Sequence, residues 1–296
     1  MLYKRLLPVI FAALLASSSH PAIAQKVIKL SNQDKDWSKD YPPFRIAGNL
    51  YYVGTYDLAV YLVTTPQGHI LVNTGLDDSE PLIRAHLKTL GFRYRDIKIL
   101  LATHAHFDHV GAMAAIKKAT GAQVMINEKD AAVLADGGNS DFALGGRGAM
   151  FMPLKADRLL HDHDTIKLGG MEIVLLHHPG HTQGASSFLF DVRDEEHTYR
   201  VLIANMPSII SETNLAGMPG YPDVAKDYGY TLNVMKGLQF DLWLSSHASQ
   251  FGFHKKHHPG DAYNPGAFKD RAGYDAALAE LTKSYQYKLN IKQADH

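Results

Sequence analysis

One short segment constrains this chain more than any other: residues 104–109 read HAHFDH and directly follow an apolar strand predicted over Lys98–Thr103. Alternate residues of an extended segment share a face, so His104 and His106 can point to one place. Asp108 and His109 then turn over the start of the next helix, toward a second place nearby. Imidazole nitrogens and a carboxylate oxygen suit zinc, and an open coordination position makes such a site catalytic. The segment therefore predicts a zinc site, in preference to histidines that only bond backbone carbonyls.

Two later histidines complete a ligand count. His181 lies in a sharp turn, HPGHTQG at 178–184, after the predicted strand 171–176, and His247 follows the predicted strand 240–245. A lone histidine is more often a surface or core residue, but ligands converge at strand ends in α/β sheets. We therefore expect two zinc ions with three ligands each: His104, His106 and His181 for one, and Asp108, His109 and His247 for the other.

The composition excludes several other kinds of site. The chain has 296 residues and 17 histidines but no cysteine, which rules out disulfides, thiolate catalysis, iron–sulfur clusters and cysteine-bound zinc. Lys and Arg total 30, as do Asp and Glu, so the formal net charge is zero. The chain therefore has no excess of positive charge that would indicate binding to nucleic acid or to an anionic membrane.

The first 24 residues have the pattern of a secretory signal peptide. Lys4 and Arg5 precede the apolar run Leu6–Leu15, and the small residues Ala22 and Ala24 form a cleavage site. The run is about half of the roughly 20 apolar residues that a membrane anchor needs. We expect residues 1–24 to be removed and the mature protein, 25–296, to be periplasmic without further contact with a membrane.

Strand-like and helix-like segments alternate from residue 45 onward without a composition break, which predicts a single α/β domain over 25–296. Strands are expected at 49–53, 59–64, 69–73, 98–103, 123–127, 171–176, 186–191, 199–204 and 240–245. Helices are expected from 77 and over 111–119, 128–135, 223–238 and 268–292.

The segment Asp136–Pro153 is rich in glycine and lacks any period, so it is predicted to be a long loop. It is either a substrate lid, with apolar contacts from Phe142, Leu144 and Met150, or an ordinary surface loop. The histidines at 254, 257 and 258 lie among lysines and are expected at the solvated surface.

These motifs together resemble the metallo-β-lactamase superfamily. The resemblance rests on the strand followed by HAHFDH, on the Pro179-Gly180-His181-Thr182 turn, and on the late His247 after a strand. It spans essentially the whole mature chain. It implies an αβ/βα sandwich of two mixed β-sheets flanked by helices, with the metals at one edge between the sheets.

Details of the sequence select a subclass within that superfamily. Thioesterase, lactonase and phosphodiesterase members carry a bridging Asp that has no counterpart in 202–208, and two β-lactamase subclasses use a Cys ligand. The third subclass uses neither, and its Gly-Thr-x-Asp-Leu element matches 54–58. Segments 44–54 and 204–208 look like its GOB-type enzymes. The chain departs from these relatives at three positions. It has His104 where GOB-type enzymes often have Gln, Asn73 where the superfamily usually has Asp, and Met206 where the subclass often has Ser.

The resemblance implies a mechanism and a substrate. A zinc-bound hydroxide would hydrolyse the β-lactam amide of penicillins, cephalosporins and carbapenems, with Asp108 orienting the hydroxide. Ser208 would bind the substrate carboxylate, and the enzyme would act as a monomer that confers antibiotic resistance. A dizinc lactonase or thioesterase is the alternative enzyme. A non-catalytic periplasmic zinc-binding protein is the alternative of another class.

Overall fold

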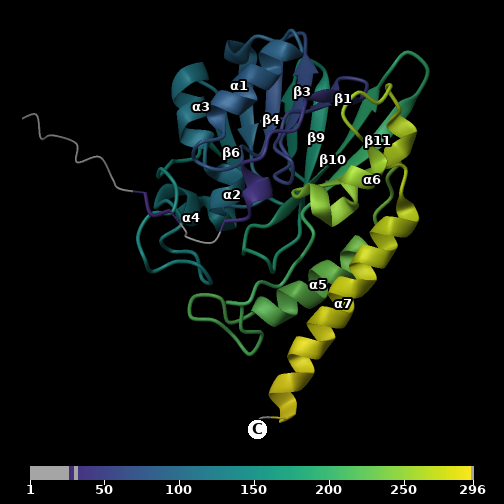
Figure 1. Cartoon of the computed structure of the whole chain (residues 1–296). Coiled ribbons are helices and arrows are strands. Elements are labelled where there is room, and N and C mark those ends of the chain that lie inside the picture. Colours follow the sequence, from purple (N-terminus) through teal and green to yellow (C-terminus); the bar gives the residue numbers. More distant parts are fainter. Residues whose placement is uncertain (1–26, 30–32, 295–296) are drawn as a thin grey trace, which may run out of the picture.

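The computed structural model describes residues 27–29 and 33–294, which form a layered sandwich. Two β-sheets pack face to face in the middle, and helices cover the outer face of each sheet (Figure 1). The fold class predicted from the sequence, an αβ/βα sandwich of two mixed sheets, is confirmed. The predicted signal peptide, 1–24, lies outside the described residues. Among those residues, no helix is both long enough and apolar enough to cross a bilayer.

The larger sheet contains seven strands in chain order, β1 to β7. Neighbours are antiparallel from β1 to β4 and parallel from β4 to β7, which brings the carboxyl ends of β4, β5 and β6 to one edge. The strands are Phe44–Ala47 (β1), Leu50–Tyr52 (β2), Tyr61–Thr65 (β3), Gly68–Val72 (β4), Ile97–Leu101 (β5), Gln123–Asn127 (β6) and Arg158–Leu160 (β7).

The smaller sheet contains five strands in the order β12-β11-β10-β9-β8. Its strands pair antiparallel except for β11 and β12, which are parallel. The strands are Thr165–Leu168 (β8), Met171–His177 (β9), Ser186–Arg193 (β10), Thr198–Ala204 (β11) and Leu242–Ser245 (β12).

The helices fall into two groups, as Figure 1 shows: α1 and α3 lie over the larger sheet, and α5 and α7 pack together beside the smaller one. Their bounds are Glu80–Thr89 (α1), Phe107–Val110 (α2), Met113–Thr120 (α3), Ala131–Ala135 (α4), Val224–Met235 (α5), Phe253–Lys256 (α6) and Arg271–Ala294 (α7).

Alternation along the strands of the larger sheet builds two hydrophobic cores. Ile70 in β4 and Leu101 in β5 belong to the core between the sheets, whereas their neighbours Leu71 and Leu100 belong to the core under α1 and α3. Successive side chains of a strand point to opposite faces, so this sheet is buried on both sides. Its strands therefore read as continuous apolar runs, and β5 delivers the residues after Leu101 to the edge between the sheets.

Several sequence expectations need correction. Three short strands, β1, β7 and β8, were not predicted, and the helix expected over 111–119 is preceded by the separate turn of α2. His257 is not a solvated surface residue: it is 8% exposed and its ring stacks on Phe44 with centroids 3.5 Å apart. Tyr41 Oη lies 2.9 Å from Nδ1 of the same imidazole, so a polar partner compensates its burial.

Candidate metal centre

The edge where β5 ends carries the HAHFDH segment. His104 and His106 lie in the extended turn after the strand, while Asp108 and His109 lie in α2, for which His106 is the N-terminal flanking residue. The four residues are buried, between 1% and 7% exposed. His181 from the turn after β9 is also buried, and His247 lies two residues after the end of β12.

Three histidines form the first cluster. One ligand atom from each of His104, His106 and His181 lies within 4.8 Å of the other two. Their ring centroids are 4.6 to 4.8 Å apart, and the rings meet edge to face rather than stacking. This is the set that the sequence assigned to one zinc ion, and it comes together from segments about 75 residues apart along the chain.

The second cluster centres on one oxygen of Asp108. Nε2 of His109 lies 3.2 Å from Oδ2 of Asp108, and Nε2 of His247 lies 3.3 Å from the same oxygen. The structure therefore brings together the other three predicted ligands. His104 also lies close to this cluster, because one ligand atom each from His104, Asp108 and His109 falls within 4.8 Å of the others.

Unpartnered nitrogens test whether these clusters suit a metal. Nε2 of His104 and Nδ1 of His109 are buried without a hydrogen-bond partner. A buried polar atom without a partner costs about 1–3 kcal/mol, so these nitrogens fit a cation-binding role better than they fit a satisfied core. Six nitrogen and carboxylate donors with no thiolate fit zinc.

The protonation states of His104 and His181 also suit a metal. Burial, together with neighbouring histidines, holds the pKa of His104 well below its usual range, and the same causes lower the pKa of His181 to about 3. These imidazoles are therefore neutral, which is the form that binds a cation. Burial opposes ionisation of Asp108, but the charges and hydrogen bonds of His109 and His247 outweigh it and hold its pKa well below the usual range.

Each cluster has partners that orient its imidazoles. Nδ1 of His181 donates to the backbone carbonyl of Ser208 at 2.8 Å, and Nδ1 of His247 contacts Oδ2 of Asp57 at 2.9 Å. Such partners fix which ring nitrogen faces a metal. The sequence placed Asp57 only in a matching motif and did not predict its contact. Ser208, predicted to bind substrate, is half-buried beside His181, with Oγ 3.3 Å from Nδ1.

A buried carboxylate that the sequence analysis missed ties the two histidine segments together. Asp130 is 1% exposed and accepts hydrogen bonds from the backbone N–H of Ala105, the hydroxyl of Thr182 and the N–H of Gly184. A side chain at Gly184 would place its Cβ 2.6 Å from Cγ of Asp130, so only glycine permits this approach.

The turn that carries His181 is fixed from its other side by α5. Gly180 has a φ of +134°, and a Cβ there would meet the Tyr228 ring at 2.9 Å. Thr231 donates to the carbonyl of Pro179 at 2.6 Å, and the hydroxyl of Tyr228 donates to the carbonyl of Ser208 at 3.0 Å. These contacts place His181 on a supported turn rather than on a free loop.

Two departures from the resembled enzymes lie deep in the structure. Asn73 is fully buried with a φ of 62°, and its Oδ1 accepts from the backbone N–H of Thr103 at 2.9 Å. It therefore supports the strand end before His104 even without a carboxylate. Met206 is 2% exposed in the core between the sheets, so it presents no polar group to the site.

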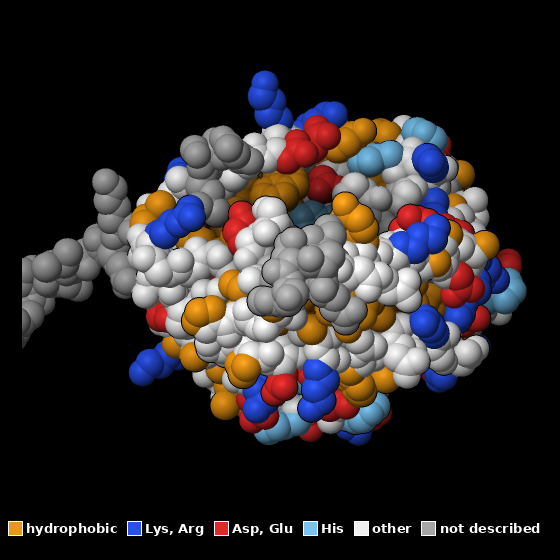
Figure 2. Space-filling model, turned by 90° about the horizontal axis from the view of Figure 1, so that it is seen from below, with side chains coloured by type: hydrophobic (Ala, Val, Ile, Leu, Met, Phe, Trp, Pro, Cys, Tyr) orange, Lys and Arg blue, Asp and Glu red, His pale blue; other side chains and the backbone are white. Residues whose placement is uncertain are grey.

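The strand ends open onto a hollowed face. Figure 2 shows this face with histidine and acidic side chains at depth and hydrophobic side chains beside them. The loop 136–153, predicted as a long loop, contains neither helix nor strand. The predicted apolar contact from Met150 is wrong: Met150 is 5% exposed and packs in the core of the larger sheet. Phe142 instead packs against Tyr221, with ring centroids 4.9 Å apart.

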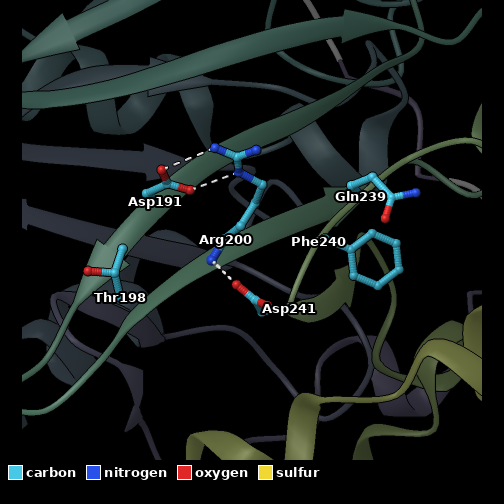
Figure 3. Close-up of a pocket in the computed structure, with 6 residues that line it drawn as sticks. All are labelled: Asp191, Thr198, Arg200, Gln239, Phe240 and Asp241. Carbon is cyan, nitrogen blue, oxygen red and sulfur yellow. Dashed lines mark hydrogen bonds and ion pairs between the residues drawn. The ribbon is translucent and has the colours of Figure 1, made fainter.

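A second depression, of about 360 Å³, lies at the other end of β10 and β11 (Figure 3). Nε of Arg200 donates to Asp191 at 3.0 Å, and the backbone N–H of Arg200 donates to Asp241 at 2.8 Å. None of the six proposed metal ligands lines this depression, so it is separate from the histidine clusters.

Comparison with known proteins agrees with this geometry. Residues 56–194 match the family described as "Metallo-beta-lactamase superfamily". A β-lactamase from Chitinophaga pinensis is 65% identical, with a TM-score of 0.88 over 89% of this chain and 100% of its own. The chain belongs to the metallo-β-lactamase superfamily.

Other members of the superfamily have the same fold. A class B3 di-zinc metallo-β-lactamase, LRA-12, from an Alaskan soil metagenome is 60% identical, with a TM-score of 0.87 over 89% of this chain and 100% of its own. GOB-18 from Elizabethkingia meningoseptica, also a metallo-β-lactamase, is 51% identical, with a TM-score of 0.89 over 90% and 99% of the two chains. The predicted resemblance to the GOB-type enzymes is confirmed.

Matches to curated relatives cover a smaller part of this chain. A hydroxyacylglutathione hydrolase of Rhodopseudomonas palustris is 30% identical over 130 residues, which are 44% of this chain and 42% of the relative. The chain thus spans less than half the length of the curated relatives it matches first.

Proposed function

We propose that this protein is a zinc-dependent β-lactamase of class B3, which hydrolyses the β-lactam amide bond. The observation that carries the proposal is the pair of adjoining His and Asp clusters, completed by His247 without a cysteine. The three solved structures that are 51–65% identical to this chain are named β-lactamases, and one of them is described as di-zinc. The match with this chain covers nearly the full length of each.

Six residues would hold two zinc ions. His104, His106 and His181 would bind the first ion, and Asp108, His109 and His247 would bind the second. Bound zinc supplies a Lewis acid and lowers the pKa of water to near neutrality. The remaining steps depend on what the residues of this chain hold in place.

Asp108 is the proposed catalytic residue. Its carboxylate stays ionised because His109 and His247 hold its pKa well below the usual range. An ionised carboxylate can accept a hydrogen bond from water and so orient that water toward the lactam carbonyl. Asp108 is 7% exposed, so this hydrogen bond would form with little competition from bulk solvent.

Ser208 is the proposed substrate-binding residue. Its backbone carbonyl is occupied by His181 and Tyr228, which fixes the residue beside the first cluster. Its hydroxyl oxygen lies 3.3 Å from Nδ1 of His181, a donor, so the hydroxyl hydrogen can still be donated to the carboxylate that penicillins, cephalosporins and carbapenems share. We further propose that the enzyme acts as a monomer, that residues 25–296 form its single domain, and that it reaches the periplasm through residues 1–24.

One assay tests the function directly. A penicillin, a cephalosporin and a carbapenem are incubated with protein of measured zinc content, with and without a chelator. We expect hydrolysis that the chelator abolishes and that added zinc restores. A lactone and a thioester are tested in parallel, because preferential turnover of either would identify the alternative enzyme. Absence of chelator-sensitive β-lactam hydrolysis would overturn the proposal.

A further inference from the structure

The loop 136–153 carries a buried carboxylate that neither the six proposed ligands nor the proposed substrate contact accounts for. Oδ2 of Asp141 lies 3.2 Å from Nε2 of His106, and the two side chains are 1% and 4% exposed. A carboxylate is almost never buried to this degree without a specific partner. The contact spans 35 residues of sequence and joins an aperiodic loop to the first histidine cluster.

The other oxygen of this carboxylate is also engaged. Oδ1 of Asp141 accepts from the backbone N–H groups of Ala143 at 2.9 Å and Leu144 at 2.7 Å. Asp141 is thus an acceptor whose orientation is set by its own loop.

We infer that Asp141 is a positioning residue: it holds the ring of His106 so that Nδ1 faces the first zinc, and it couples the 136–153 loop to that metal. Because Asp141 engages Nε2, only Nδ1 of His106 remains for the cluster with His104 and His181. A neutral imidazole that binds metal through Nδ1 carries its proton on Nε2, and an anionic acceptor favours this tautomer. This inference rests on the proposed function for the presence of zinc.

The loop is tethered to the body at two positions after Asp141. The N–H of Met150 donates to the carbonyl of Gly137 at 2.7 Å, and Met150 packs in the core under the larger sheet. Next to Asp141, Phe142 packs against Tyr221, which lies in the loop before α5. The loop is therefore held between the core under the larger sheet and Tyr221, and it is not a free lid. A shift of the loop would move Asp141 and, through it, His106.

The experiment measures zinc binding rather than turnover. Asp141→Asn and Asp141→Ala are compared with wild type by competition for zinc against a chromophoric chelator, and by zinc content after dialysis. Asp136→Asn is the matched control, because it removes the same charge from the same loop without a contact to a histidine. We expect Asp141→Asn to weaken the first zinc roughly 10–100-fold and Asp136→Asn to leave it unchanged.

A second measurement needs no variant and guards against misfolding. Imidazole ¹⁵N–¹H correlation spectra of the zinc-loaded wild-type protein should show His106 protonated at Nε2. Protonation at Nδ1, or wild-type zinc affinity in Asp141→Asn, would overturn the inference. Either outcome could occur in a protein that still hydrolyses β-lactams. Failure of the proposed function is a different result: the wild-type protein itself would show no chelator-sensitive turnover.

Discussion

Asp57 accepts a hydrogen bond from Nδ1 of His247 at 2.9 Å, across 190 residues of sequence. The same Asp57 oxygen accepts from the indole N–H of Trp37 at 3.1 Å, and the other oxygen accepts from the backbone N–H of Ser249 at 2.8 Å. With Nδ1 engaged, His247 presents Nε2 to Asp108. The second proposed zinc site therefore depends on a residue near the start of the described chain.

Asp57→Asn should loosen this second site. The amide keeps the size of the side chain but removes the charge that favours a proton on Nδ1 of His247, so zinc affinity at that site should fall roughly 10–100-fold. Dialysed variant and wild type are compared by zinc content and by kcat at saturating zinc. Asp275→Asn, an exposed change in α7, is the control. Wild-type zinc retention in Asp57→Asn would show that Asp57 does not orient His247.

Single-ligand variants should separate the two proposed metals. His181→Ala should retain about one zinc per chain at the second site, and His247→Ala about one at the first, because each keeps the other cluster intact. We expect kcat/KM to fall at least about a hundredfold in both, since each metal would stabilise a different part of the reaction. Zinc per chain is measured by elemental analysis. Two retained zinc ions in either variant would contradict the proposed division of ligands.

The part of the site that was predictable is the part that is local in sequence. The HAHFDH segment follows one strand, and residues close in sequence determine the backbone geometry where a strand ends and a helix begins. The late His181 and His247 could be placed because strands of an α/β fold deliver their carboxyl ends to one edge. Asp141 could not be placed, because nothing periodic in its glycine-rich loop indicates which way the chain turns.

The same distinction explains the fold. Strands that are buried on both faces, such as β4, β5 and β6, read as apolar runs and were predicted. The strands β7 and β8 have only three and four residues and flank a charged turn, so their pairing comes from the sheet rather than from their own pattern. His257 was misplaced because two lysines precede it in the sequence, which suggested an exposed segment, while Phe44 and Tyr41, more than 200 residues away, enclose its ring.

His178 should make the metal-free protein less stable in acid. It is 3% exposed, and burial lowers its pKa to about 4, against about 6.5 in an unfolded chain. Below about pH 6.5 the unfolded state binds a proton that the folded state does not, so stability falls as the pH drops toward about 4 and then levels off. Between about pH 7 and pH 5 this loss is about 2 kcal/mol.

His178→Gln removes that titration, so urea unfolding should show a pH dependence smaller by about this amount than in wild type. Nδ1 of His178 bonds the hydroxyl of Ser187 at 2.7 Å, and an amide can replace that contact. His197→Gln, at a histidine with 61% side-chain exposure, is the control and should keep the wild-type pH dependence. Equal pH dependence in His178→Gln and wild type would show that His178 is not the titrating group.

Ser208→Ala should raise KM while leaving zinc content and kcat near wild type. The contact that supports His181 comes from the backbone carbonyl of Ser208, which the substitution retains. Only the hydroxyl is lost, and a hydrogen bond to a charged carboxylate is worth about 1.5–3 kcal/mol, or roughly a tenfold or greater rise in KM. Ser211→Ala is the matched control, because its hydroxyl, in the same loop, donates to the exposed Glu212. A wild-type KM in Ser208→Ala, with zinc content unchanged, would remove Ser208 from the substrate site.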